Sequence, residues 1–93
     1  MGSVNVGPGI QFTSAHNGTS NPAVDTIAVG ASMTWTWSGS LPHSVESLGS
    51  PTFLSSSVMT GSGTHVVAFN TAGTYTYDCV THGSAMSGRV IVR

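Results

Sequence analysis

Short runs of β-branched and aromatic residues, separated by glycine, proline, asparagine and serine, recur along the whole of this 93-residue chain. None of the runs has the spacing of an amphipathic helix, and several alternate between apolar and polar residues. Successive residues of a strand point to opposite faces of a sheet, so this alternation indicates half-buried strands. The chain is therefore predicted to be an all-β protein, a Greek-key sandwich or barrel of about seven to eight strands.

The individual strands can be assigned from the same runs. The predicted ranges are Val4–Val6, Ile10–Thr13, Val24–Val29, Ser32–Trp37, Ser44–Ser47, Thr64–Phe69, Thr74–Cys79 and Gly88–Val92. Parity within these strands predicts that Trp35, Tyr77 and Cys79 face the core. The segment 49–63, rich in serine and glycine, is predicted to be a long connection across the sandwich, with one helical turn over 53–57.

Charge is nearly absent from the sequence. Two basic residues stand against three acidic ones, for a net charge of −1, so no basic stripe is available to bind nucleic acid or anionic lipid. No apolar run approaches the length of a membrane span, and no charged-then-apolar leader precedes the fold. We expect one soluble domain over 1–93, a mature chain without its signal peptide, with residues 1–3 as the remnant of an expression tag.

The segment GTYTYDCVTHGSAM, residues 73–86, contains the residues with the most distinctive chemistry. A predicted strand ends at Cys79, the single cysteine, and a short loop then presents His82 and Met86. Sulfur ligands with imidazole favour copper, and two histidines, a thiolate and a weak thioether are the ligands of blue-copper sites. Three other histidines could supply the second imidazole. His43 is placed best, because Pro42 precedes it and a new strand follows.

Several segments of the chain resemble the cupredoxin family, particularly its plastocyanin, pseudoazurin and amicyanin members. The segments are TIAVGASMTWTW, LPHSVES, GTYTYDCVTHGSAM and GRVIV. The resemblance runs from residue 4 to the C-terminus and implies a cupredoxin-like fold that binds one copper ion per chain through His43, Cys79, His82 and Met86. The Cys-x2-His spacing agrees with that group, whereas the His-x3-Met spacing is one residue shorter than in plastocyanins and pseudoazurins and one longer than in amicyanins.

The same resemblance implies how such a site is supported and used. Ser44 stands where plastocyanins have an asparagine that ties the two ligand loops together, and its N–H should reach the Cys79 sulfur. Thr81 replaces a proline of plastocyanin and could donate a second N–H to that sulfur. His82 would be the point at which electrons enter and leave, within a neutral apolar surface. That surface would include Leu41, Pro42, Gly83 and Ala85.

The expected function is that of a one-electron carrier cycling between Cu(II) and Cu(I), which is not an enzyme. It is expected to act as a monomer with redox protein partners, in the periplasm or another extracytoplasmic compartment. A copper store or sensor of the same fold is the alternative. An enzyme with a Cys79–His82 nucleophilic pair is a weaker alternative, because no oxyanion donor or orienting acid is evident.

Each candidate ligand also has a plainer interpretation when it is taken singly. A lone cysteine such as Cys79 is more often a buried thiol, and a lone methionine such as Met86 more often fills a core. His16 lies in a turn-like stretch and is expected to be exposed. His65 has inward parity, and we interpret it as a satisfied or partly exposed histidine rather than a fifth ligand.

Overall fold

The computed structural model describes residues 2–93, which form ten strands and no helix, and hence no helix that could cross a membrane. The strands are β1 (Gly2–Val6), β2 (Phe12–Ser14), β3 (Ala23–Ile27), β4 (Ser32–Trp37), β5 (Pro42–His43), β6 (Glu46–Leu48), β7 (Met59–Thr60), β8 (Gly63–Ala68), β9 (Gly73–Cys79) and β10 (Gly83–Val92). The all-β prediction is confirmed.

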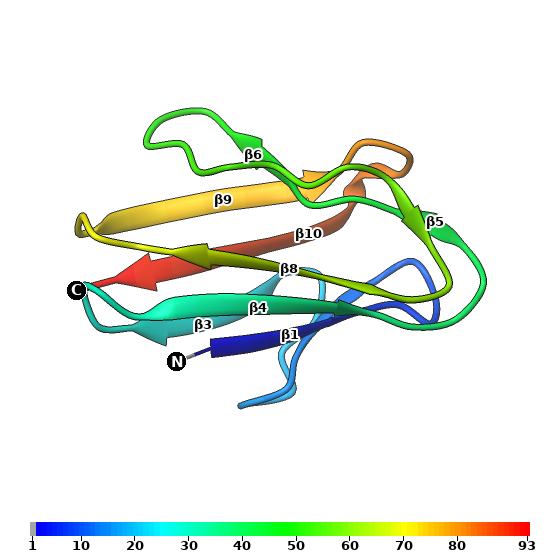
Figure 1. Ribbon diagram of the computed structural model, residues 1–93, viewed down its shortest axis with the longest axis horizontal. Coiled ribbons are helices and arrows are strands. Elements are labelled where there is room, and N and C mark those ends of the chain that lie inside the picture. The colour runs from blue at the N-terminus through cyan, green and yellow to red at the C-terminus, as the bar shows by residue number, and fades with distance from the viewer. Residues whose placement is uncertain (1) are drawn as a thin grey trace.

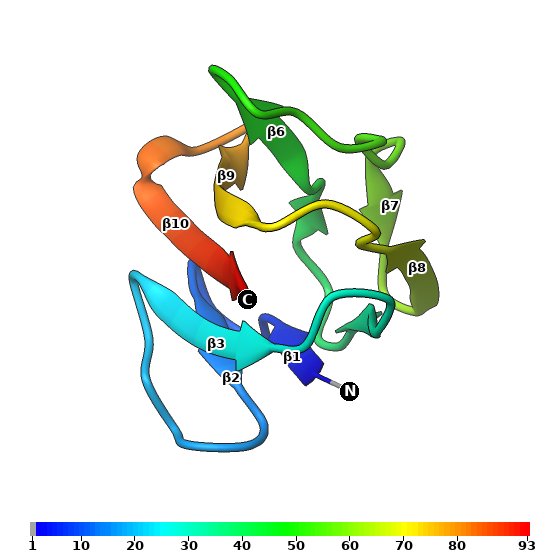
Figure 2. The same ribbon diagram turned by 90° about the vertical axis from the view of Figure 1, so that its left-hand side faces the viewer.

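Eight of the strands form two four-stranded sheets that pack face to face (Figures 1 and 2). One sheet has the order β2-β1-β4-β8 and the other has the order β3-β10-β9-β6. β1 pairs in parallel with β4, and β3 pairs in parallel with β10, while the other neighbours are antiparallel. Two sheets joined in this way make the predicted Greek-key sandwich, and β5 and β7 form a separate two-stranded sheet at one end.

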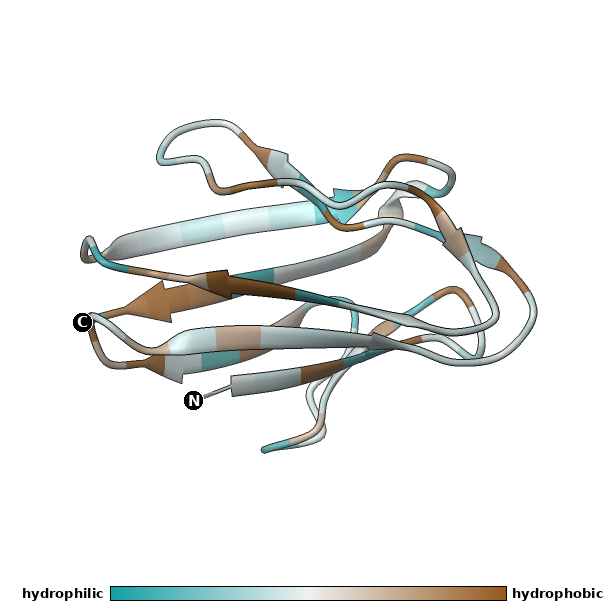
Figure 3. Cartoon of the chain, in the orientation of Figure 1, coloured by the Kyte–Doolittle hydropathy of each residue, from teal (hydrophilic) through white to brown (hydrophobic). Residues whose placement is uncertain are grey.

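The core lies between the two large sheets and follows the predicted alternation. Trp35 of β4 and Tyr77 of β9 are buried from opposite sheets, with their rings edge to face at a centroid distance of 5.4 Å. The ring of Phe53, from the connection between β6 and β7, stacks on Trp35 at 5.5 Å. Hydrophobic residues are interspersed with pale and hydrophilic ones along most strands, and the C-terminal end of β10 is among the most hydrophobic segments (Figure 3). Burial of these aromatic rings supplies much of the stability of a chain this short.

Seven of the eight predicted strands lie close to their predicted places, and the differences fall between residues 42 and 60, where β7 was not predicted, and at the start of β10. The predicted strand Ser44–Ser47 is replaced by two short strands: β5 pairs with β7, and β6 pairs with β9. The predicted helical turn over 53–57 is absent, and the segment runs without regular structure. Its serines bond to the backbone of the preceding chain instead, as Ser56 does through its N–H to the Val45 carbonyl (2.9 Å) and its Oγ to the Val45 N–H (2.8 Å). Serine side chains that bond to the backbone compete with helix formation.

β10 begins five positions earlier than predicted and contains an irregularity that matters for the site. The pair Gly83↔Cys79 and the pair Ser87↔Asp78 are neighbours on β9, but on β10 residues 84–86 lie between them. These residues therefore form a bulge at the end of the sandwich where β9 ends, opposite the N- and C-termini (Figure 1).

Candidate metal centre

Three side chains that are far apart in the sequence meet at this end of the sandwich. Cys79 is the last residue of β9, His82 lies in the turn between β9 and β10, and His43 ends the two-residue strand β5. The turn is closed by a hydrogen bond from the His82 N–H to the Cys79 carbonyl (3.3 Å), which directs His82 back toward the cysteine. Cys79 and His43 have no solvent exposure, and His82 is half-buried.

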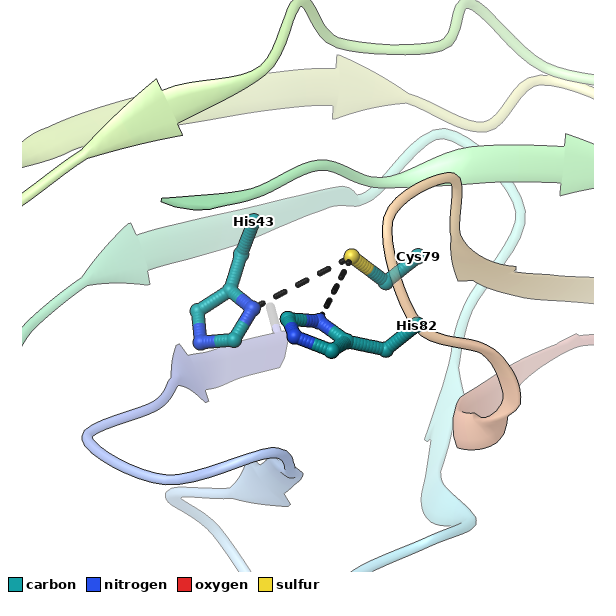
Figure 4. A group of neighbouring side chains, drawn as sticks. All are labelled: His43, Cys79 and His82. Atoms are coloured by element: carbon teal, nitrogen blue, oxygen red, sulfur yellow. Dashed lines mark hydrogen bonds between the residues drawn. The ribbon is translucent and has the colours of Figure 1, made fainter. Parts of the chain in front are cut away.

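Both imidazoles present the same ring atom to the sulfur (Figure 4). The Nδ1 atom of His43 lies 3.9 Å from the Cys79 Sγ, and the Nδ1 atom of His82 lies 3.6 Å from it. The ligand atoms of the three residues all lie within 4.8 Å of one another. A first-row metal ion about 2.0 Å from a nitrogen and about 2.3 Å from a sulfur, in a trigonal arrangement, separates those two atoms by about 3.7 Å. The three residues therefore fit around one ion.

His43 is held in an environment that favours the neutral ring. Its backbone carbonyl accepts a hydrogen bond from the indole Nε1–H of Trp37 (2.9 Å). Burial lowers the pKa of His43, and the charge of His82 lowers it further, while the backbone of Gly9 acts to raise it. The buried Nε2 atom of His43 has no hydrogen-bond partner among the described residues. A neutral imidazole is the form that binds a metal ion.

Ser44 connects the two segments that carry the ligands. Its backbone N–H donates to the Cys79 Sγ at 3.4 Å, as the resemblance implied. Its Oγ also accepts the N–H of Val80, the residue after the cysteine, at 3.0 Å. The hydroxyl of Ser44 thus joins the two ligand-bearing segments, which is the role that the resemblance gave to an asparagine in plastocyanins. Among the described residues no hydrogen bond joins the Thr81 N–H to the sulfur, so Ser44 is the one N–H donor found there.

The other candidate residues have separate places. Met86 lies in the bulge of β10 and is fully buried, so its thioether points into the protein rather than into solvent. His65 lies on β8, where its Nε2 is 2.7 Å from the Leu54 carbonyl and its ring packs beside Trp35, and it does not join the metal-ligand group. His16 is exposed in the turn after β2, as expected.

Two contacts of the site were not anticipated from the sequence. The Trp37 indole reaches a backbone carbonyl, and strand parity could indicate only that Trp37 is buried. The influence of Gly9 on His43 comes from the connection between β1 and β2, which carries no motif. Contacts with backbone groups leave little trace in a single sequence.

A sandwich of two mixed sheets with one cysteine sulfur and two imidazoles gathered at one end has the donor set of a copper protein. The chain belongs to the plastocyanin/azurin family of copper-binding proteins, because the sequence model of that family matches residues 13–93. The residues of the site are consistent with one copper ion.

Solved structures show the same fold. A purple cupredoxin from Nitrosopumilus maritimus superimposes with a TM-score of 0.78 at 22% identity, and the match covers 100% of both chains. The P96G variant of amicyanin in its oxidised form superimposes with a TM-score of 0.76 at 24% identity, covering 98% of this chain and 80% of amicyanin. The M98A variant of amicyanin, in its Cu(I) form, gives 0.74 at 22% identity over the same shares. No curated protein sequence matches the chain.

Proposed function

We propose that this protein is a mononuclear blue-copper electron carrier in which His43, Cys79, His82 and Met86 hold a single copper ion. The observation that carries the proposal is the convergence of two Nδ1 atoms on one buried sulfur, at 3.9 and 3.6 Å. Copper bound there would supply one-electron chemistry through its Cu(II) and Cu(I) states. The residues of the chain hold this ion and determine how close it lies to the surface.

Each ligand residue has a distinct task in this proposal. Cys79 supplies the thiolate, which the Ser44 N–H stabilises by a charge-assisted hydrogen bond. His43 is fully buried at the end of the sandwich, so it limits how far the site can rearrange when the charge changes. His82 is the half-buried ligand and gives the shortest route to the surface. Met86, buried in the bulge, supplies the weak axial thioether.

We propose that redox proteins dock on the neutral surface that flanks His82. Leu41 and Pro42 precede His43 and are exposed, and so is Ala85 in the bulge. Val80, beside Cys79, is another exposed apolar residue at this end of the molecule, at 58% exposure. An uncharged surface beside a half-buried ligand suits a brief, short-range encounter between carriers. No substrate is transformed, and we propose that the protein acts as a monomer in an extracytoplasmic compartment.

The first test is the addition of one equivalent of Cu(II) to the metal-free protein. An intense sulfur-to-copper charge-transfer band should appear with a stoichiometry of one ion per chain, because Cys79 must bind as a thiolate. Cys79→Ser should bind copper more weakly and stay colourless, whereas Ser40→Ala, an exposed position outside the site, should match the wild type. Copper binding by the wild type without that band, or a coloured serine variant, would refute the assignment.

A further inference from the structure

The side chain of Asn21 joins three parts of the backbone that are distant in the sequence. Asn21 lies just before β3, and its Oδ1 accepts the Phe12 N–H and the Ser87 N–H, each at 3.3 Å. Its Nδ2 donates to the Ile10 carbonyl at 2.9 Å. The bond to Ser87 spans 66 positions of the sequence. One amide therefore connects the start of β2, the connection before it and the bulge of β10.

The bond to Ser87 falls at the end of the bulge that carries Met86. From Gly88 onward β10 is held on both sides, since Gly88 pairs with Tyr77 on β9 and with Ala23 on β3. Residues 84–86 have no counterpart on β9, so the β9 ladder does not fix them. Ser87, one residue after Met86, pairs with Asp78 on β9, and its N–H also attaches the end of the bulge to the β2–β3 connection through Asn21.

The other bonds of Asn21 anchor it to the segment beside His43. Ile10 and Phe12 belong to the β1–β2 connection and the start of β2. Ile10 follows Gly9, whose backbone acts to raise the pKa of His43. Asn21 therefore links the backbone that carries Met86 to the backbone that borders His43.

The conformation of Asn21 explains why an asparagine stands there. Its φ is 42°, and among the described residues it is the one non-glycine residue with positive φ. Asparagine and glycine are the residues that adopt this left-handed region most readily. Glycine at this position would keep the backbone and remove only the side chain, which makes Asn21→Gly a clean deletion of the amide.

We propose that Asn21 is a positioning residue for the axial ligand, holding the β10 bulge so that the Met86 thioether keeps a fixed distance from the other three ligands. This inference rests on the proposed copper function. The amide sets the position of Met86 through the Ser87 N–H and does not itself touch the metal site.

The test compares Asn21→Gly and Asn21→Asp with the wild type, each also made in a Met86→Leu background. Asn21→Asp keeps an oxygen that can accept both N–H groups, and replaces the donor to the Ile10 carbonyl by a second acceptor oxygen. Asn70→Gly is the matched control, because Asn70 is exposed and its side chain makes no hydrogen bond within residues 2–93. The measurements are the relative intensities of the sulfur-to-copper bands, the reduction potential, and amide exchange of Met86 and Ser87 in the metal-free protein.

Asn21→Gly should change the band ratio and raise the reduction potential, in the direction of Met86→Leu but by less, because a loosened axial donor stabilises Cu(II) less. Copper affinity should fall about 10-fold, the lower end for loss of a residue that orients ligands. Exchange at Met86 and Ser87 should quicken without copper. Asn21→Asp should lie between Asn21→Gly and the wild type. In the Met86→Leu background the shift in potential should vanish.

Three results would overturn the inference. A lower melting temperature with unchanged spectrum and potential would make Asn21 purely structural. An equal shift in the Met86→Leu background would mean that Asn21 acts through another ligand. Unchanged amide exchange would mean that the bond to Ser87 does not hold the bulge. Failure of the proposed function is distinguishable, since the wild type would then lack the charge-transfer band or Met86→Leu would leave the potential unchanged.

Discussion

At the scale of single residues, Ser44 bears on the cysteine in two ways. The backbone N–H acts on the sulfur itself, whereas the hydroxyl acts on the backbone of the next residue, Val80. Ser44 is almost fully buried, so the bond from Val80 is shielded from water. The two roles can be separated, because an alanine keeps the N–H and loses only the hydroxyl.

Ser44→Ala should therefore keep the copper colour and lower the free energy of unfolding of the metal-free protein by about 1 kcal/mol, the usual net value of one hydrogen bond. Urea denaturation measures this difference. Ser40→Ala is the control, since Ser40 is exposed and the change there should stay within about 0.5 kcal/mol. Equal stability of Ser44→Ala and the wild type would show that the hydrogen bond between the Val80 N–H and the Ser44 hydroxyl contributes nothing to the free energy of unfolding.

At the scale of strands, the sequence predicts what local alternation determines and misses what depends on distant partners. The strand Ser32–Trp37 is found with the bounds predicted, because its apolar and polar residues alternate without interruption. β5 and β7 have two residues each and are defined only by their pairing, for which no local pattern exists. The early start of β10 depends on the single pair Gly83↔Cys79 beyond the bulge.

The same distinction applies to the site. Cys79 and His82 are close in sequence, so their spacing already indicated a metal site, and the proline before His43 singled out the histidine that the fold brings beside them. Asn21 and the hydroxyl of Ser44 act through backbone groups tens of residues away. A single sequence contains no signal for such contacts, because any residue supplies the N–H.

β3 carries a buried carboxyl group that makes folding depend on pH. Oδ1 of Asp25 accepts a hydrogen bond from the Ser14 Oγ at 2.7 Å, while Oδ2 has no partner. Burial raises the pKa of Asp25, and the Ser14 bond and the charge of His16 offset this in part. Burial raises the pKa of Tyr77 on β9, and the charge of the Asp25 carboxyl group raises it further.

A carboxyl group with a raised pKa keeps its proton in the folded state at pH values where the unfolded chain has lost it. The stability of the metal-free protein should therefore fall as the pH rises above about 4, and level off once the folded pKa is passed. Asp25→Asn should reduce this fall and be more stable than the wild type at pH 7. Urea midpoints measured from pH 4 to pH 8 test this expectation.

Asp78 contributes a slope of the same sign, which the experiment must separate. Burial, and then the facing Glu46 on β6, raise the pKa of Asp78 to about 6. Asp78→Asn is therefore the companion variant. The double variant should lose the fall and keep only the opposite slope from His43, whose lowered pKa makes the folded state more stable as the pH rises toward neutral. If Asp25→Asn keeps the full slope of the wild type, the carboxyl group of β3 is not the one that titrates.

At the scale of the whole molecule, the charges are few and unevenly placed. The sheet formed by β1, β2, β4 and β8 contains no aspartate, glutamate, lysine or arginine within its strands. The charged residues of the sequence all lie in the other sheet or after it. They are Asp25, Glu46, Asp78, Arg89 and Arg93. With a net charge of −1, the molecule has little long-range field with which to attract or repel a partner.

Electron self-exchange between oxidised and reduced copies of the protein tests this picture without any assumption about the natural partner. If electrons pass through the neutral surface at His82, two copies can approach there without charge repulsion. The self-exchange rate, measured by line broadening in NMR spectra of mixed oxidation states, should then be fast and change little with ionic strength. A copper store or sensor without an electron-transfer role would instead exchange slowly.

Ala85→Glu should place two like charges across this contact and slow self-exchange at low salt, with recovery as salt screens the repulsion. Thr74→Glu is the matched control, because it adds the same charge at an exposed position near the far end of β9, about 16 Å from Cys79. It should leave the rate close to that of the wild type. A steep salt dependence in the wild type, or equal slowing by the two glutamates, would mean that electrons do not leave through the surface around His82.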